Sequence, residues 1–143
     1  MIKIILLPII AGAIAQIIKL FISSNKLKFN FKNLFAYSGM PSSHSAAVSS
    51  LTLIIGLIDG WNTSVFALSF IFAIVVIRDA TGLRRYLGQH GKILNILVKD
   101  LKDDEVLEEH YPKLLEKIGH TPLQVLIGCI IGITVSTIGY YLF

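Results

Sequence analysis

Four long apolar stretches dominate the sequence and restrict it to folds that keep them out of water. They cover about residues 4–21, 43–58, 64–77 and 122–143. As an α-helix, the first stretch would extend roughly 27 Å, which is enough to cross the hydrocarbon core of a bilayer. Hydrophobic residues make up 54% of the chain, too large a share for an ordinary soluble domain. We therefore predict an all-α integral membrane protein with about four transmembrane helices, forming a single domain over residues 1–143.

The segment 92–118 lies between the last two apolar stretches and has a different pattern. Apolar residues recur there at helical spacing, with charged residues on the other faces, which predicts short amphipathic helices lying on the membrane surface. Its acidic run 103–109 is interpreted as a solvated helix face and not as a metal site. The basic segment 23–38, which also contains phenylalanines, suits either the lipid headgroup layer or a plain solvated linker.

The order of the four stretches predicts which polar segments meet on one side of the membrane. Successive spans run in opposite directions, so both termini share one side and the opposite side receives the remaining helix ends. These ends bring together Lys19, the turn at 39–46, Asp79 with Arg84 and Arg85, and the segment 119–121. That side also holds every lysine and arginine except Lys3, so the positive-inside rule places it in the cytoplasm. We expect a bacterial plasma membrane, with both termini outside.

The turn at 39–46, with the sequence GMPSSHSA, precedes the second apolar stretch. Ser42 or Ser43 can cap the helix that follows, because a hydroxyl satisfies an amide that the first turn leaves unpaired. The amides of that turn and the positive end of the helix dipole favour an anion, which makes both serines candidate phosphate-binding residues. His44 could exchange a proton with the bound anion. The plainer alternative is a capped membrane helix with a histidine at the interface.

The polar residues collected on the cytoplasmic side could together remove a phosphoryl group. This reaction needs cations around the phosphate oxygens, a nucleophile, and a proton donor for the leaving alkoxide. The cations could come from Lys19, Arg84 and Arg85, and the other two groups from His120 and His44. The sequence contains no carboxylate cluster typical of a two-metal phosphatase and no glycine-rich nucleotide loop. We therefore expect neither a metal nor a cofactor.

Three motifs from this side occur in an order that is typical of one family: Gly39–Ala46, Asp79–Arg85 and Gly119–Pro122. Together they resemble the divergent membrane branch of the type 2 phosphatidic acid phosphatase superfamily, also described as acid phosphatase/vanadium-dependent haloperoxidase-related. The resemblance covers nearly the whole chain. It implies a metal-independent phosphatase that works through a phosphohistidine, with His120 as the nucleophile and His44 as the general acid.

The resemblance also implies phosphate binding by Arg84 or Arg85 and by Lys19. The sequence departs from the superfamily at Gln124, because an acid normally stands four residues after the nucleophile. Our hypothesis is that Asp79 replaces this acid and accepts a hydrogen bond from the nucleophilic histidine. The alternative is an ion pair between Asp79 and a neighbouring arginine that only holds the turn. The chain also has fewer spans than the superfamily's six-helix core, which leaves room for a homodimer.

We expect the protein to hydrolyse a lipid phosphomonoester of the phosphatidylglycerophosphate or phosphatidic acid type, since these lipids are made on the cytoplasmic face. This lipid and the bilayer are the expected partners, and no nucleic acid is expected. One alternative is a non-catalytic membrane protein that binds phospholipid or another anion at a lapsed phosphatase site. A small transporter or channel subunit is a further alternative, but its spans should be polar at mid-depth, whereas these are polar mainly at one end.

Overall fold

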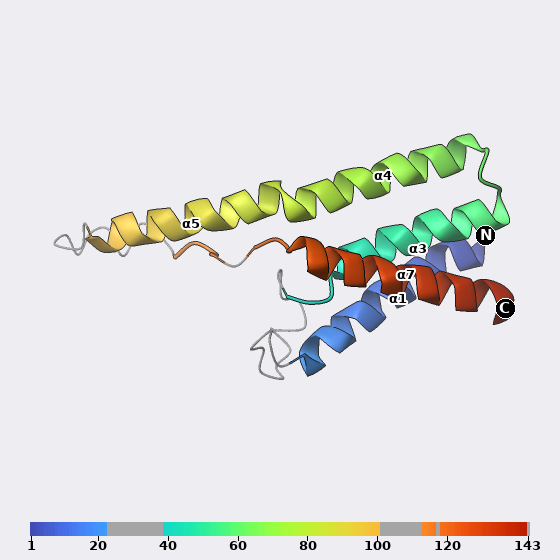
Figure 1. Ribbon diagram of the computed structural model, residues 1–143, viewed down its shortest axis with the longest axis horizontal. Helices are drawn as coiled ribbons and strands as arrows, with labels where there is room; N and C mark the ends of the chain where they lie inside the picture. Colours follow the sequence, from blue (N-terminus) through green and yellow to red (C-terminus); the bar gives the residue numbers. More distant parts are fainter. Residues whose placement is uncertain (23–38, 101–112, 117, 143) are drawn as a thin grey trace.

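The computed structural model describes residues 1–22, 39–100, 113–116 and 118–142, and within these ranges the regular structure is entirely helical. The helices are α1 (Ile2–Phe21), α3 (Ser43–Ile58), α4 (Ser64–Thr81), α5 (Leu83–Asp100) and α7 (Pro122–Leu142) (Figure 1). The prediction of an all-α fold is confirmed. The expectations for segments 23–38 and 103–109 lie outside the described residues.

Three helical stretches are long and apolar enough to cross a membrane: Ile2–Phe21, Ser64–Lys99 and Pro122–Leu142. The fourth, α3, is apolar as well but has only 16 residues. Large apolar side chains cover the outer surfaces of α1, α4 and α7, where a soluble protein would be polar. These features confirm an integral membrane protein.

Helix α3 is the centre of the bundle, and α1, α4 and α7 pack around it (Figure 1). The close approach of α3 to α7 depends on two glycines, because a Cβ on Gly128 would collide with the Ser42 carbonyl and one on Gly132 with the Ala46 carbonyl. Buried hydroxyls reinforce the contact. Ser136 Oγ lies 2.6 Å from Ser50 Oγ, and both serines are buried and lie away from the ends of their helices.

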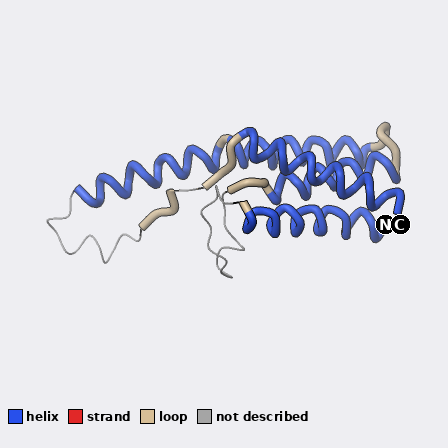
Figure 2. Tube along the Cα trace, turned by 60° about the horizontal axis from the view of Figure 1, so that its bottom comes forward, coloured by secondary structure: helices blue, strands red, loops and turns tan. Residues whose placement is uncertain are grey.

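The two chain ends lie together at one end of the bundle, as alternating spans require (Figure 2). The opposite end carries the last turns of α1 and α4 and the first turns of α3 and α7 (Figure 1). This end is called the polar end below. The helix order therefore brings the three sequence motifs to the same end of the molecule.

The region after α4 differs from the expected turn followed by surface helices. Gly82 interrupts α4 only briefly, since its amide still donates to the Arg78 carbonyl (2.9 Å) and its carbonyl accepts from the Tyr86 amide (3.0 Å). Helix α5 consequently begins at Leu83 instead of about residue 92, and it continues the direction of α4 beyond the bundle (Figure 1). Residues 113–116, for which a short helix was expected, are not helical.

Candidate functional site

His120 stands just before α7 and is joined to the end of α4 through its backbone. Its amide donates to the Ala80 carbonyl at 2.9 Å, and only 5% of the residue is exposed. The preceding Gly119 has φ +90°, and a Cβ there would lie 2.7 Å from the Arg85 amide nitrogen. A side chain would be strained at this φ and would collide with the α5 backbone. Glycine at 119 therefore allows His120 to approach α4 and α5 closely.

The His120 ring faces the side chain of Gln124, one turn further along. Nδ1 of the ring lies 3.4 Å from Oε1 of Gln124, and the same oxygen accepts from the Thr121 amide at 3.0 Å. Thr121 Oγ1 in turn accepts from the Gln124 amide at 3.4 Å, which completes a reciprocal cap of α7. Because Oε1 can only accept, Nδ1 must carry the proton in this hydrogen bond.

Burial lowers the pKa of the His120 imidazole below its usual 6.5, and the positive charge of Lys19 lowers it further. Hydrogen bonds from the ring to Gln124 and to the Gly39 backbone raise the pKa, and a further contribution from His44 lowers it. The result is a neutral ring near neutral pH. The neutral ring carries one proton, and when Nδ1 donates it to Gln124 the electron pair is on Nε2.

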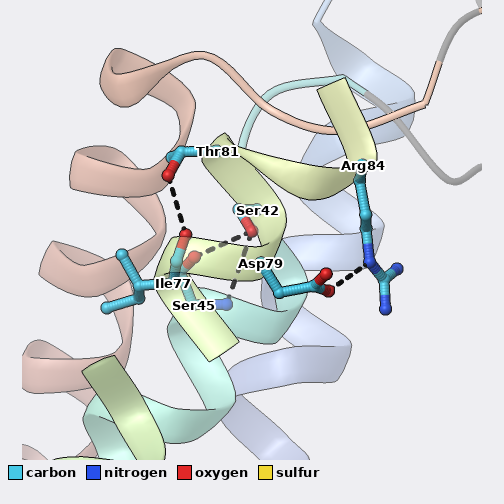
Figure 3. A network of polar contacts seen from close by, with 6 residues as sticks. All are labelled: Ser42, Ser45, Ile77, Asp79, Thr81 and Arg84. Carbon is cyan, nitrogen blue, oxygen red and sulfur yellow. Dashed lines mark hydrogen bonds and ion pairs between the residues drawn. The ribbon is translucent and has the colours of Figure 1, made fainter. Parts of the chain in front are cut away.

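His44 lies in the first turn of α3, where Ser42 caps the helix. Ser42 Oγ accepts from the Ser45 amide (3.4 Å) and from the Ser45 hydroxyl (2.9 Å), as Figure 3 shows. The Ser42 amide donates to the Gln124 carbonyl at 3.1 Å, so the start of α3 is bound to the start of α7. Ser42 is fully buried, whereas Ser43 is partly exposed and His44 is exposed. Of the two candidate serines, Ser43 is therefore the more accessible to a ligand.

Charged side chains from α1, α4 and α5 act on His44, and the α1 charge of Lys19 acts on His120 as well. Arg84 Nε lies 2.6 Å from Asp79 Oδ2, and both side chains are about one-third exposed (Figure 3). Lys19 occupies the last turn of α1 and is only 1% exposed. The charges of Arg84, Lys19 and Asp79 all act on His44. These three residues, with His44 and His120, form what we call the polar-end cluster.

The structure distinguishes between the two roles considered for Asp79, which are hydrogen bonding to His120 and ion pairing with an arginine. Its carboxylate pairs with Arg84, while the hydrogen-bond partner found for His120 Nδ1 is Gln124. This geometry matches the alternative in which Asp79 holds the turn through an arginine. It also distinguishes the two arginines, because Arg84 belongs to the cluster, whereas the side chain of Arg85 is exposed and its backbone contacts Gly119.

One feature of the site was missed from the sequence. The Ala80 carbonyl fixes the backbone of His120, and no local pattern marks a carbonyl as an acceptor for a residue 40 positions away. The sequence does mark Gln124, four residues after His120, and its side-chain oxygen both caps α7 and faces the His120 ring. Within the described ranges, no group of three histidine, cysteine or acidic side chains is arranged to hold a metal.

Comparison with known proteins identifies the family. Residues 2–135 match the sequence model of the Divergent PAP2 family. The chain belongs to this family. It is also 38% identical, over 141 residues, to the uncharacterized membrane protein YuiD of Bacillus subtilis (strain 168), an alignment that covers 90% of this chain and 88% of the relative. No solved structure matched the chain.

Membership of the Divergent PAP2 family confirms the resemblance drawn from the three motifs, which all fall within the matched residues. In this member the polar-end cluster offers a buried neutral imidazole, a second and exposed imidazole, and two cations. That set of groups can bind an anion and exchange a proton with it.

Proposed function

We propose that this member of the Divergent PAP2 family is a phosphatase that hydrolyses a lipid phosphomonoester through a phosphohistidine. The observation that carries the proposal is the state of His120. Its ring is buried, its pKa is lowered, and its Nδ1 faces Gln124, so that Nε2 offers an electron pair beside the cationic Lys19. A buried ring that only packs the helices would also need a hydrogen-bond partner, but it would not need the neighbouring Lys19, whose charge opposes protonation of the ring and suits a bound anion.

The proposed first step transfers the phosphoryl group to the protein. Nε2 of His120 forms a bond to phosphorus as the bond between phosphorus and the lipid oxygen breaks. Protonated His44 gives its proton to the departing alkoxide, which leaves as the lipid alcohol. Lys19 and Arg84 stabilise the charge that gathers on the phosphoryl oxygens in the transition state.

The second step restores the protein. Neutral His44 removes a proton from a water molecule as the water oxygen attacks the phosphohistidine. The bond between Nε2 and phosphorus breaks, inorganic phosphate leaves, and His44 is protonated again for the next cycle. The sum is hydrolysis of one phosphomonoester by one water, and it requires no metal ion.

The amide of Gln124 can hold the His120 ring in one tautomer, but it cannot balance the positive charge that develops on the ring. We therefore propose a slower phosphatase than one with a carboxylate at this position. Asp79 would act indirectly, by holding the Arg84 side chain toward the site.

The proposed substrate is a lipid of the phosphatidylglycerophosphate or phosphatidic acid type. The polar end would face the cytoplasm of a bacterial cell, since the described cations lie there except for Lys3, which is in the first turn of α1. Lipid phosphates made on the cytoplasmic face would reach this end directly. A second candidate function, anion binding without turnover, is favoured by one observation, the amide at position 124 in place of an acid.

Phosphate release from a panel of lipid phosphates by the purified protein, with and without a chelator, tests the proposal. We expect metal-independent release, and a loss of about 100-fold to 10,000-fold in His120→Gln and His44→Gln. His90→Gln is the matched control, because His90 is an exposed histidine on α5 outside the cluster. Equal turnover in all three variants would exclude the phosphohistidine mechanism. Lipid binding without turnover by the wild-type protein would favour the second candidate.

A further inference from the structure

A non-helical segment, residues 113–116 and 118–119, runs beside α5 toward the start of α7 and is called the strap (Figure 1). Asn95 of α5 holds one end of it. The side-chain Nδ2 donates to the Leu114 carbonyl, and the side-chain Oδ1 accepts from the Leu114 amide, each at 2.9 Å. Nδ2 also lies 2.9 Å from a carboxylate oxygen of Glu116. One amide side chain thus pairs with both backbone groups of the same strap residue.

Two glycines of α5 allow the strap backbone to lie directly on the helix. A Cβ on Gly91 would be 2.9 Å from the Leu115 carbonyl oxygen, and a Cβ on Gly88 would be 2.7 Å from the Glu116 carbonyl oxygen. Real Cβ atoms essentially never come so close to another heavy atom, so a side chain at either position would push the strap away. Glycine costs stability within a helix, yet α5 contains two of them at the strap contact.

These contacts follow one another in order toward the site. Asn95 meets Leu114, Gly88 meets Glu116, and Gly119 meets the backbone of Arg85. The next residue is His120, whose amide then donates to the Ala80 carbonyl. The strap is therefore fixed along α5 up to the residue before the histidine.

The contact to α5 is separate from the packing of the bundle. Helix α5 extends beyond the ends of the neighbouring helices (Figure 1), so the strap is bound outside the region where α3 and α7 pack. From these contacts we infer that Asn95, Gly88 and Gly91 are positioning residues for His120, which act by fixing the strap. Their role in turnover rests on the proposed function, whereas their effect on the position of the ring does not.

The test compares Gly88→Ala and Asn95→Ala with Gln89→Ala, a change at an exposed neighbour on the same helix. The ring of His120 is titrated by ¹⁵N NMR in histidine-labelled protein in lipid nanodiscs. We expect the pKa of His120 to rise toward its usual range in both test variants, because a displaced strap exposes the ring and moves it from Lys19. Gln89→Ala should titrate like the wild type. An unchanged titration in both test variants would overturn the inference.

A second measurement separates positioning from simple loss of stability. Gly88→Ala should lower kcat about 100-fold with little change in KM, as expected for a reacting group displaced by about 1 Å. Asn95→Asp keeps the acceptor for the Leu114 amide but loses the donor to the Leu114 carbonyl, so it should shift the titration in the same direction as Asn95→Ala. A wild-type titration in Asn95→Asp, with the protein folded, would count against the role of Asn95. Shifted titrations together with an inactive wild type would support the positioning role and refute the phosphatase.

Discussion

Arg84 and Asp79 form an ion pair across the short break between α4 and α5, with Nε and Oδ2 2.6 Å apart. The pair directs one of two adjacent arginines toward the polar-end cluster. Asp79 and Arg84 are each about one-third exposed, so the pair itself is worth at most about 1 kcal/mol of stability. Its importance would lie in placing a cation beside His44, on which the charge of Arg84 acts.

The two adjacent arginines should therefore differ in their effect on substrate binding. We expect Arg84→Gln to raise KM for a lipid phosphate about tenfold or more, because a charge-assisted contact to phosphate is lost. Arg85→Gln, which removes the same charge from an exposed side chain, is the control and should change KM little. Steady-state kinetics of both variants in the same detergent would show the difference. Equal effects would mean that the net charge of the surface, and not the Asp79 contact, recruits the substrate.

Protein stability should decrease in mild acid because of His120. The folded state holds the pKa of this histidine below 6.5, so the unfolded chain takes up a proton more readily. The contribution is fully present above pH 6.5 and is lost as the pH falls from 6.5 toward the lower pKa of the folded state. The slope cannot exceed about 1.4 kcal/mol per pH unit for one proton.

Thermal unfolding of the detergent-solubilised protein between pH 7.5 and pH 5 would measure this loss. The matched variant His120→Gln retains a polar side chain that does not titrate, and it should show a shallower dependence on pH. An identical pH dependence in the variant would show that other groups cause the acid sensitivity.

The sequence predicted the polar end well because topology alone determines it. Alternating spans must bring Lys19, His44 and His120 to one end, whatever the details of packing. Helix α5 was not predicted from residue 83, because Gly82, Gly88 and Gly91 are all unfavourable within a helix. The strap supplies the missing explanation for two of these glycines, and it is a contact between residues more than 20 positions apart. Periodicity in a local window does not contain such information.

The residue that pairs with Asp79 also could not be predicted from the sequence. Asp79 lies close in the chain to three arginines and close in space to the end that carries both histidines. Which of them it meets depends on the direction of one side chain at the end of α4, and in the structure that partner is Arg84. By contrast, Gln124 stands four residues after His120, and the cap formed with Thr121 turns the Gln124 side-chain oxygen back toward the histidine ring.

The orientation of the chain in the membrane can be tested at two exposed positions. Asn62 lies in the turn between α3 and α4, and Gln89 lies on α5 at the opposite end. In a Cys129→Ser background, Asn62→Cys should react with a membrane-impermeant maleimide on intact cells. Gln89→Cys should react only after the cells are permeabilised, if the end rich in lysine and arginine faces the cytoplasm as the positive-inside rule predicts. The reverse pattern would place the cluster outside and would direct the search to lipid phosphates of the outer leaflet.

The final prediction concerns the Gln124→Glu variant. A carboxylate at this position would accept the same hydrogen bond from His120 Nδ1, and it would also balance the positive charge that the ring acquires during phosphoryl transfer. The variant should raise the pKa of His120, because an opposite charge nearby favours the protonated ring. We expect kcat to rise at least about tenfold, with the gain largest above the new pKa, where the ring is still neutral in the resting state.

The control for this prediction is Gln89→Glu, which adds the same charge to an exposed site on α5. It should leave both the His120 titration and kcat unchanged. If Gln124→Glu raises the pKa without raising kcat, His120 is not the nucleophile. If the wild-type protein shows no turnover and Gln124→Glu gains it, the amide at position 124 is what limits the wild-type protein. The natural chain would then be a lipid-phosphate binder built on a phosphatase site, since every other group of the polar-end cluster would already be competent.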